Sequence, residues 1–203
     1  MIFTRTVAAF FLILVAVHLS GCTQPAATVA YRPGYFTEKA DVFIVRPFGA
    51  TFDDAQKDSD LLPNWILKIR PEPQTETDIK AGWAASVALS EQIVATLNAR
   101  GFPAVLAAKG QTVTPKTGII LGQFVNQESG NDNLRPSIGY RAGKPVETRV
   151  QLIQNHQFIG ELKVHAHDKD DAKQASASIA RQIADVLEQA YIKNGWMAPP
   201  IKK

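Results

Sequence analysis

The order of hydrophobic and polar residues predicts a strand, a helix and a second strand in the first half of the chain. Residues 41–48 are a run of β-branched and aromatic side chains, which is typical of a buried strand. Residues 81–100 have apolar side chains at helical spacing, and Gly101 follows where a helix end favours a left-handed residue. Residues 103–108 form a brief second strand. The helix face predicted to be buried consists of Trp83, Val87, Val94 and Leu97, with Leu89 and Ile93 beside it.

The second half predicts a central strand, a long loop, a hairpin and a last helix. Residues 117–127 are apolar enough for a central strand, and residues 128–144 are a loop rich in Gly and Asn that joins neighbouring strands. In the hairpin, apolar and polar residues alternate over 146–153 and again over 158–166. Residues 168–194 have apolar side chains at helical spacing and are predicted to form the last helix. The face of the hairpin predicted to meet water carries Glu147, Arg149 and Gln151, and Asn155 and His156 make its turn.

The order β-α-β-β-β-β-α predicts an α+β fold. We expect a mixed, mainly antiparallel sheet of about five strands, with two helices covering one face. Residues 40–195 are predicted to form this single domain. The proline-containing segment 49–79 is predicted to be an insertion, and residues 196–203 a tail.

The N-terminus has the pattern of a lipoprotein signal peptide. Arg5 precedes an unbroken apolar run at 7–17, which is too short to span a bilayer. Leu-Ser-Gly-Cys follows at 19–22, and small residues before a cysteine suit cleavage and lipid transfer to its thiolate. We therefore expect residues 1–21 to be removed and Cys22 to become the lipidated first residue.

An anchor at Cys22 predicts a protein that faces the periplasm. Thr23 follows the cysteine, and the absence of Asp at this position favours the outer membrane over the inner membrane. Acyl chains such as palmitate, each with many buried methylene groups, make such an anchor effectively permanent. Residues 22–39 contain prolines and little periodicity, so they are predicted to be the lipidated N-terminus and its tether.

Composition narrows the class of protein. The chain has 203 residues, a formal net charge of +3 and a single cysteine. Its charge is too small and too dispersed for a nucleic-acid-binding surface. Because one cysteine cannot form an internal disulfide, the domain must be stable through its core alone.

The central loop resembles a known family. Its pattern is Gly122-Gln123-Phe124, then Gly130-Asn131, then Arg135, then the run Ile138-Gly139-Tyr140-Arg141-Ala142-Gly143, followed by an alternating strand. This is similar to the core of the lipoprotein family called domain of unknown function 4410, and the resemblance covers residues 41–191. It implies an envelope lipoprotein with an α+β domain and implies no activity.

The sequence has one weak candidate for a metal site and none for catalysis. His165 and His167 lie two residues apart on a predicted strand, so both point to the same face and could share a metal. Solvated histidines at a strand end are the commoner outcome. No hydrolase motif or paired acids are present, so we expect neither an enzyme nor a cofactor.

Two segments are candidate interaction surfaces for an envelope protein partner. Trp65 and Ile66 lie in an apolar stretch of the insertion, which either packs over the sheet as a lid or docks a partner. The loop before the hairpin carries Arg135, Tyr140 and Arg141. We expect Arg135 to hydrogen-bond within the loop and Arg141 to stay exposed for a partner.

Overall fold

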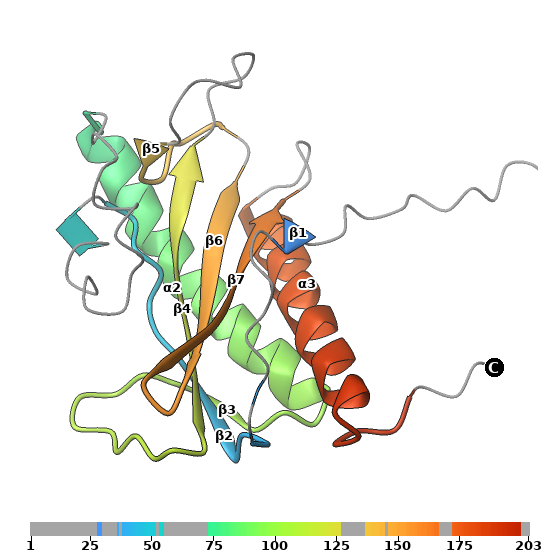
Figure 1. Ribbon diagram of the computed structural model, residues 1–203. Helices are drawn as coiled ribbons and strands as arrows, with labels where there is room; N and C mark the ends of the chain where they lie inside the picture. The colour runs from blue at the N-terminus through green and yellow to red at the C-terminus, as the bar shows by residue number, and fades with distance from the viewer. Residues whose placement is uncertain are drawn as a thin grey trace, which may run out of the picture.

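The protein is an α+β domain built on one sheet (Figure 1). The computed structural model describes residues 28–29, 36, 38–51, 53–54, 73–126, 137–144, 146–166 and 172–199. Within them, seven strands join in the order β1-β7-β6-β4-β2-β3, and β5 pairs with β4. The predicted fold class is confirmed, with two additional strands of two residues each. The strands are β1 (Thr28–Val29), β2 (Val42–Val45), β3 (Ala104–Leu106), β4 (Thr117–Asn126), β5 (Ser137–Ile138), β6 (Glu147–Gln154) and β7 (Gln157–His165).

The sheet is parallel on one side and antiparallel on the other. Strand β2 pairs in parallel with both β3 and β4. Strands β4, β6 and β7 form an antiparallel meander, to which β1 and β5 add. The helices α2 (Glu76–Ala99) and α3 (Ala172–Lys193) lie side by side against one face (Figure 1). This arrangement gives the sheet a helix-covered face and an opposite face.

The core lies between the helices and the sheet. From the sheet it takes Phe43, Ile120 and Phe124 among others, all with almost no exposure. At one end, the ring of Tyr191 contacts Phe102 edge to face, with centroids 4.9 Å apart, and its hydroxyl accepts a hydrogen bond from the backbone N–H of Ala40. Burial of this apolar surface is the main stabilising contribution in a chain whose only cysteine is at position 22.

Helix α2 buries two different kinds of side chain. Its C-terminal half packs with Leu89, Ile93 and Leu97, as predicted. Its N-terminal half and its middle instead bury small residues at helical spacing, and the predicted burial of Trp83 and Val87 is wrong. The small buried residues are Gly82, Ser86 and Ser90.

The small residues are buried because the backbone of residues 46–50 runs close to the helix. The hydroxyl of Ser86 donates to the carbonyl of Phe48 at 2.7 Å. A Cβ at Gly82 would lie 2.8 Å from the Cβ of Tyr140 and 3.0 Å from that of Ala50. Large side chains have no room on this face, so Trp83 and Val87 project to solvent with 54% and 55% exposure.

The hairpin forms where it was predicted, but its polar face is buried. Asn155 and His156 make the turn with φ of 49° and 57°, the backbone of the turn that favours Asn. Glu147 and Gln151 are buried, so the prediction that this face meets water is wrong. Alternation determines which residues share a face, but it does not determine whether another part of the molecule covers that face.

The boundaries of the helices differ from the sequence prediction. Helix α2 begins at Glu76, inside the segment predicted to be an insertion, because Thr75 and Asp78 form a capping box. After α3, the ring of Trp196 packs edge to face on Tyr191, with centroids 5.2 Å apart. Packing against the core therefore continues past residue 195, where the tail was predicted to begin.

Candidate functional site

Residues 137–144, which we call the loop platform, are tied to the sheet and to the start of α2. Strand β5 pairs with the end of β4, and the N–H of Gly139 donates to the carbonyl of Phe124 at 3.0 Å. The N–H of Tyr140 donates to the carbonyl of Ala50 at 3.0 Å. The amide nitrogen of Gln74 donates to the carbonyls of both Ala50 and Tyr140. Contacts from three directions thus hold the second half of the predicted loop.

Asp78 connects the platform to the helix. Its carboxylate accepts hydrogen bonds from the backbone and hydroxyl of Thr75 at the helix start. The same carboxylate accepts from the backbone N–H of Ala142 at 2.9 Å and lies 3.4 Å from the guanidinium of Arg141. These donors, the Ala142 N–H first among them, lower the pKa of Asp78 from 3.8 to about 2. One side chain therefore caps α2 and fixes the platform.

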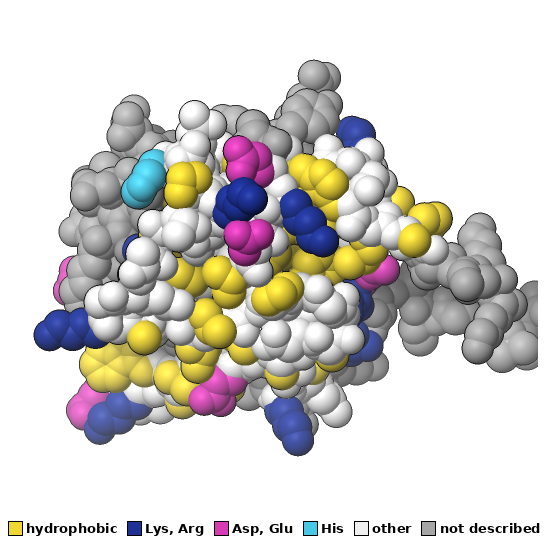
Figure 2. Space-filling model, turned by 90° about the horizontal axis from the view of Figure 1, so that it is seen from below, with side chains coloured by type: hydrophobic (Ala, Val, Ile, Leu, Met, Phe, Trp, Pro, Cys, Tyr) yellow, Lys and Arg dark blue, Asp and Glu magenta, His cyan; other side chains and the backbone are white. Residues whose placement is uncertain are grey.

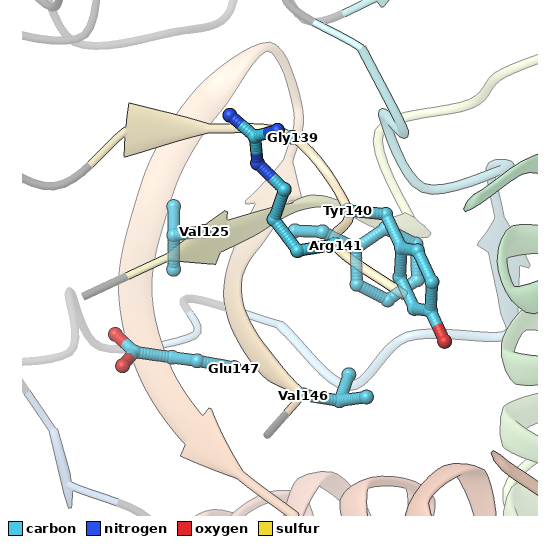
Figure 3. Close-up of a pocket in the computed structure, with 7 residues that line it drawn as sticks. Val125, Gly139, Tyr140, Arg141, Val146 and Glu147 are labelled. Atoms are coloured by element: carbon cyan, nitrogen blue, oxygen red, sulfur yellow. The ribbon is translucent and has the colours of Figure 1, made fainter. Parts of the chain in front are cut away.

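A shallow hollow lies between the platform and the start of β6 (Figure 3). It is lined by Phe124, Val125, Gly139, Tyr140, Arg141, Val146 and Glu147. Tyr140 packs its ring edge to face on Phe124, with centroids 5.3 Å apart. Figure 3 shows the charged ends of Arg141 and Glu147 well apart from each other. Its volume is about 10 Å³, which is room for about one water molecule, whereas sites for small organic ligands usually measure at least about 300 Å³. The hollow is therefore too small to bind such a ligand.

A second group of polar residues, which we call the polar sheet face, lies on the side of the sheet away from the helices. Its members are Gln123 on β4, Glu147, Arg149 and Gln151 on β6, and Glu161, Lys163 and His165 on β7. The two carboxylates each face a cation. Arg149 and Glu161 approach to 3.5 Å, and Glu147 lies 3.0 Å from Lys163 and 3.3 Å from His165.

Burial shifts the pKa values of the central pair toward the neutral forms. Glu161 is 2% exposed, and burial raises its pKa more than Arg149 and a hydrogen bond from Gln151 lower it. Burial likewise lowers the pKa of Arg149, against the attraction of Glu161 and Glu147. In the described part of the chain, Glu161 Oε2, Gln123 Nε2 and Gln151 Oε1 have no hydrogen-bond partner. Several buried donors and acceptors on this face are therefore unsatisfied by the described residues.

The exposed face of α2 presents an aromatic side chain in a fixed orientation. The indole N–H of Trp83 donates to the carboxylate of Asp54 at 3.2 Å. Asp54 and Thr51 in turn exchange two hydrogen bonds, each 3.1 Å long. Val87 lies one turn further along the helix, and we call the two residues the helix patch. The sequence signal for it was the spacing of Gly82, Ser86 and Ser90, which is typical of close packing on the neighbouring face of the helix.

The described residues include three of the predicted site residues. Tyr140 lies in the platform with its ring on the core. Arg141 is half-buried against Asp78, so the prediction that it stays exposed is wrong. His165 lies on the polar sheet face beside Glu147. The other predicted residues lie outside the described part of the chain: Cys22, Trp65, Ile66, Arg135 and His167.

The described residues hold neither a metal cluster nor a membrane-spanning helix. They contain no group of three or more His, Cys, Asp and Glu side chains placed to hold a metal ion. Because His167 is outside them, shared metal binding by His165 and His167 stays a hypothesis. None of the helices in the described ranges has the length and apolar character to cross a membrane.

Comparison with known proteins adds little to this geometry. No family model matches the chain, and no curated protein matches it. The chain resembles the crystal structure of a neuraminyllactose-binding hemagglutinin homolog from Helicobacter pylori, with 8% identity over 85% of this chain and 92% of that chain. The TM-score is 0.26, and a likeness of this size carries no inference about fold or function.

Proposed function

We propose that the protein is a lipid-anchored protein of the bacterial envelope that binds a protein partner through the helix patch and carries out no reaction. The anchor is Cys22, and the sequence that supports it is Leu-Ser-Gly-Cys after a short apolar run. Thr23 supports the outer membrane as the site of anchoring. The domain then lies in the periplasm.

The observation that carries the binding proposal is the exposure and fixed orientation of Trp83. Large aromatic side chains are enriched among residues that dominate binding energy at protein interfaces. Trp83 is 54% exposed, yet its indole is held by Asp54. A side chain that is already ordered loses less entropy when a partner covers it. Val87 extends the apolar surface along the helix.

The rest of the molecule supports a rigid binding surface. The face of α2 next to the patch is attached to residues 46–50 by the hydroxyl groups of Ser86 and Ser90. The loop platform holds the start of the same helix through Asp78. The patch is therefore carried by an element that has little freedom to move relative to the sheet, which favours specific recognition.

Site-specific photocrosslinking in intact cells tests the proposal. A photoreactive residue at Val87, next to the indole, should capture a defined envelope protein, and Trp83→Ala should reduce that product at least about tenfold, because loss of an interface anchor costs 2 kcal/mol or more. The matched control is Phe158→Ala, which removes another exposed aromatic side chain from β7. The control should leave the product unchanged.

Two outcomes would contradict the proposal. If Trp83→Ala and Phe158→Ala have equal effects, the helix patch does not bind the partner. If Cys22→Ser leaves fatty-acid labelling and processing of the protein unchanged, Cys22 is not the anchor. Because the two readouts are independent, the anchor and the binding surface are tested separately.

A further inference from the structure

The chain joins the sheet only a few residues after the proposed lipid anchor. Strand β1 pairs antiparallel with β7, with Thr28 opposite Lys163 and Val29 opposite Leu162. The sequence had predicted a tether over residues 22–39. The structure places a strand inside that segment.

This pairing shortens the reach of the anchor. Thr28 lies six positions after Cys22, and a fully extended chain of that length spans at most about 20 Å. A tether that continued to Ala40 would reach about 60 Å on the same basis. The pairing of β1 therefore reduces the greatest possible distance between the lipid anchor and the sheet to about one third of the distance that a tether up to Ala40 would allow.

The position of β1 also determines which end of the domain is nearest to the anchor. Lys163 lies next to the end of β7, and the end of β7 is opposite the start of β6 at Glu147. The loop platform pairs with the end of β4 and contacts the start of α2, so it belongs to this same end of the sheet. Figure 1 shows β1 and β5 at one end of the domain and the β6–β7 turn at the other. We call the first the platform end.

The opposite end is a strand length away. The ten residues of β4 span about 33 Å between the two ends. Figure 2 looks at the opposite end, where acidic and basic side chains stand next to one another among neutral and hydrophobic ones. No charge of one sign dominates this surface, so it offers no electrostatic attraction to a membrane that would compete with the anchor.

We propose that β1 clamps the anchored domain with its platform end facing the lipid surface. The inference rests on the proposed lipidation of Cys22. The lipid headgroup layer is the surface that the platform end meets. Trp83 lies seven residues into α2, about 10 Å along the helix from its start at this end. The helix patch is then close to the bilayer, and its partner is a protein embedded in or attached to the same membrane.

Distance-dependent fluorescence quenching tests the orientation. Cys22 is the only cysteine and is occupied by lipid, so one added cysteine carries the only dye. Lys144→Cys places the dye on the loop platform, and Lys116→Cys places it at the start of β4, at the opposite end. Both positions are exposed lysines, which makes them a matched pair. The lipidated proteins are inserted into vesicles of phosphatidylethanolamine and phosphatidylglycerol that carry a quencher on the headgroup.

We expect several-fold stronger quenching of the dye at position 144 than of the dye at position 116. Val29→Pro removes a backbone donor from β1 and should reduce this difference, whereas Val29→Ala should keep it. A flexible Gly/Ser insertion after Thr23 lengthens the reach without changing β1, and it should also reduce the difference. The insertion keeps the test valid if Val29→Pro does not fold.

The outcomes separate the clamp from the anchor. Equal quenching at the two positions, or stronger quenching at position 116, in protein that is lipidated and vesicle-bound overturns the clamp and leaves the anchor intact. If the wild-type chain binds vesicles no better than Cys22→Ser, the proposed function itself fails.

Discussion

A carboxylate lies beside an arginine both where the loop platform meets α2 and on the polar sheet face, yet the two carboxylates behave in opposite ways. Asp78 and Arg141 lie 3.4 Å apart, and Glu161 and Arg149 lie 3.5 Å apart. The pKa of Asp78 is lowered to about 2, while the pKa of Glu161 is raised. The distance to the cation is therefore not what distinguishes the two sites.

The difference lies in what surrounds each carboxylate. Asp78 accepts from backbone N–H groups of Thr75 and Ala142 and from the hydroxyl of Thr75, and all of these stabilise its charge. Glu161 is in the middle of a strand, where backbone N–H groups are committed to the sheet. Its oxygen Oε2 has no partner among the described residues. Hydrogen-bond donors at the start of α2 therefore stabilise the charge of Asp78, whereas the polar sheet face provides too few donors to stabilise the charge of Glu161.

The largest expected effect comes from breaking the pair on the polar sheet face. Arg149→Leu should lower the free energy of unfolding by about 3 kcal/mol at pH 7, because it leaves Glu161 buried without its cation. The double variant Arg149→Leu/Glu161→Leu should recover most of this loss, since apolar pairs often replace buried ion pairs without a penalty. Urea denaturation measures both. A double variant less stable than the single one would show that this pair is a net stabilising contact.

An intermediate effect is expected where the platform meets α2. Helix propensity alone predicts that Gly82→Ala stabilises the protein by about 1 kcal/mol. The new Cβ would instead lie 2.8 Å from the Cβ of Tyr140, an atom fixed by the backbone, so we expect a loss of about 2 kcal/mol from overpacking. The control is Ala84→Gly on the exposed face, which should cost about 1 kcal/mol. A stabilised Gly82→Ala variant, measured by thermal unfolding, would mean that helix and platform separate easily.

The smallest effects, and the sharpest contrast, concern pH. A lowered pKa means that Asp78 contributes stability above pH 3.8, and that this contribution is lost as the pH falls toward 2. A raised pKa means that Glu161 binds its proton more tightly in the folded state, so stability is lost as the pH rises above 4.5. The two carboxylates therefore change the free energy of unfolding in opposite directions as the pH rises, and they do so in different pH ranges.

Conservative variants isolate these slopes. The stability advantage of the wild type over Asp78→Asn should grow between pH 2 and 4, and the wild type should lose stability relative to Glu161→Gln above pH 4.5. Urea unfolding between pH 2 and 7 measures both differences. Slopes of the same sign would show that the two carboxylates do not differ as described.

The sequence was sufficient for most of the fold. Alternation over most of β6 and β7, with Asn155 and His156 between them, predicted the hairpin and its turn. Gly101 ends its helix with φ of 80°, as predicted. These features follow from neighbours along the chain, because side-chain periodicity and left-handed turn residues are local properties.

The candidate sites depend on contacts between residues that are far apart in the sequence, which a local sequence pattern cannot predict. The sequence determined the fold class, the hairpin and its turn, whereas the register of the hairpin shifts by one residue between Leu152 and Ile153. Only the tertiary structure decided that Trp83 is exposed, because the backbone of residues 46–50 leaves room for small side chains alone on the face of α2 that packs against it. It also decided that Arg141 pairs with Asp78, a residue 63 positions away, and that Glu161 is buried. Exposure and charge state depend on what other segments cover or donate to a residue, and that is settled only when distant parts of the chain pack together.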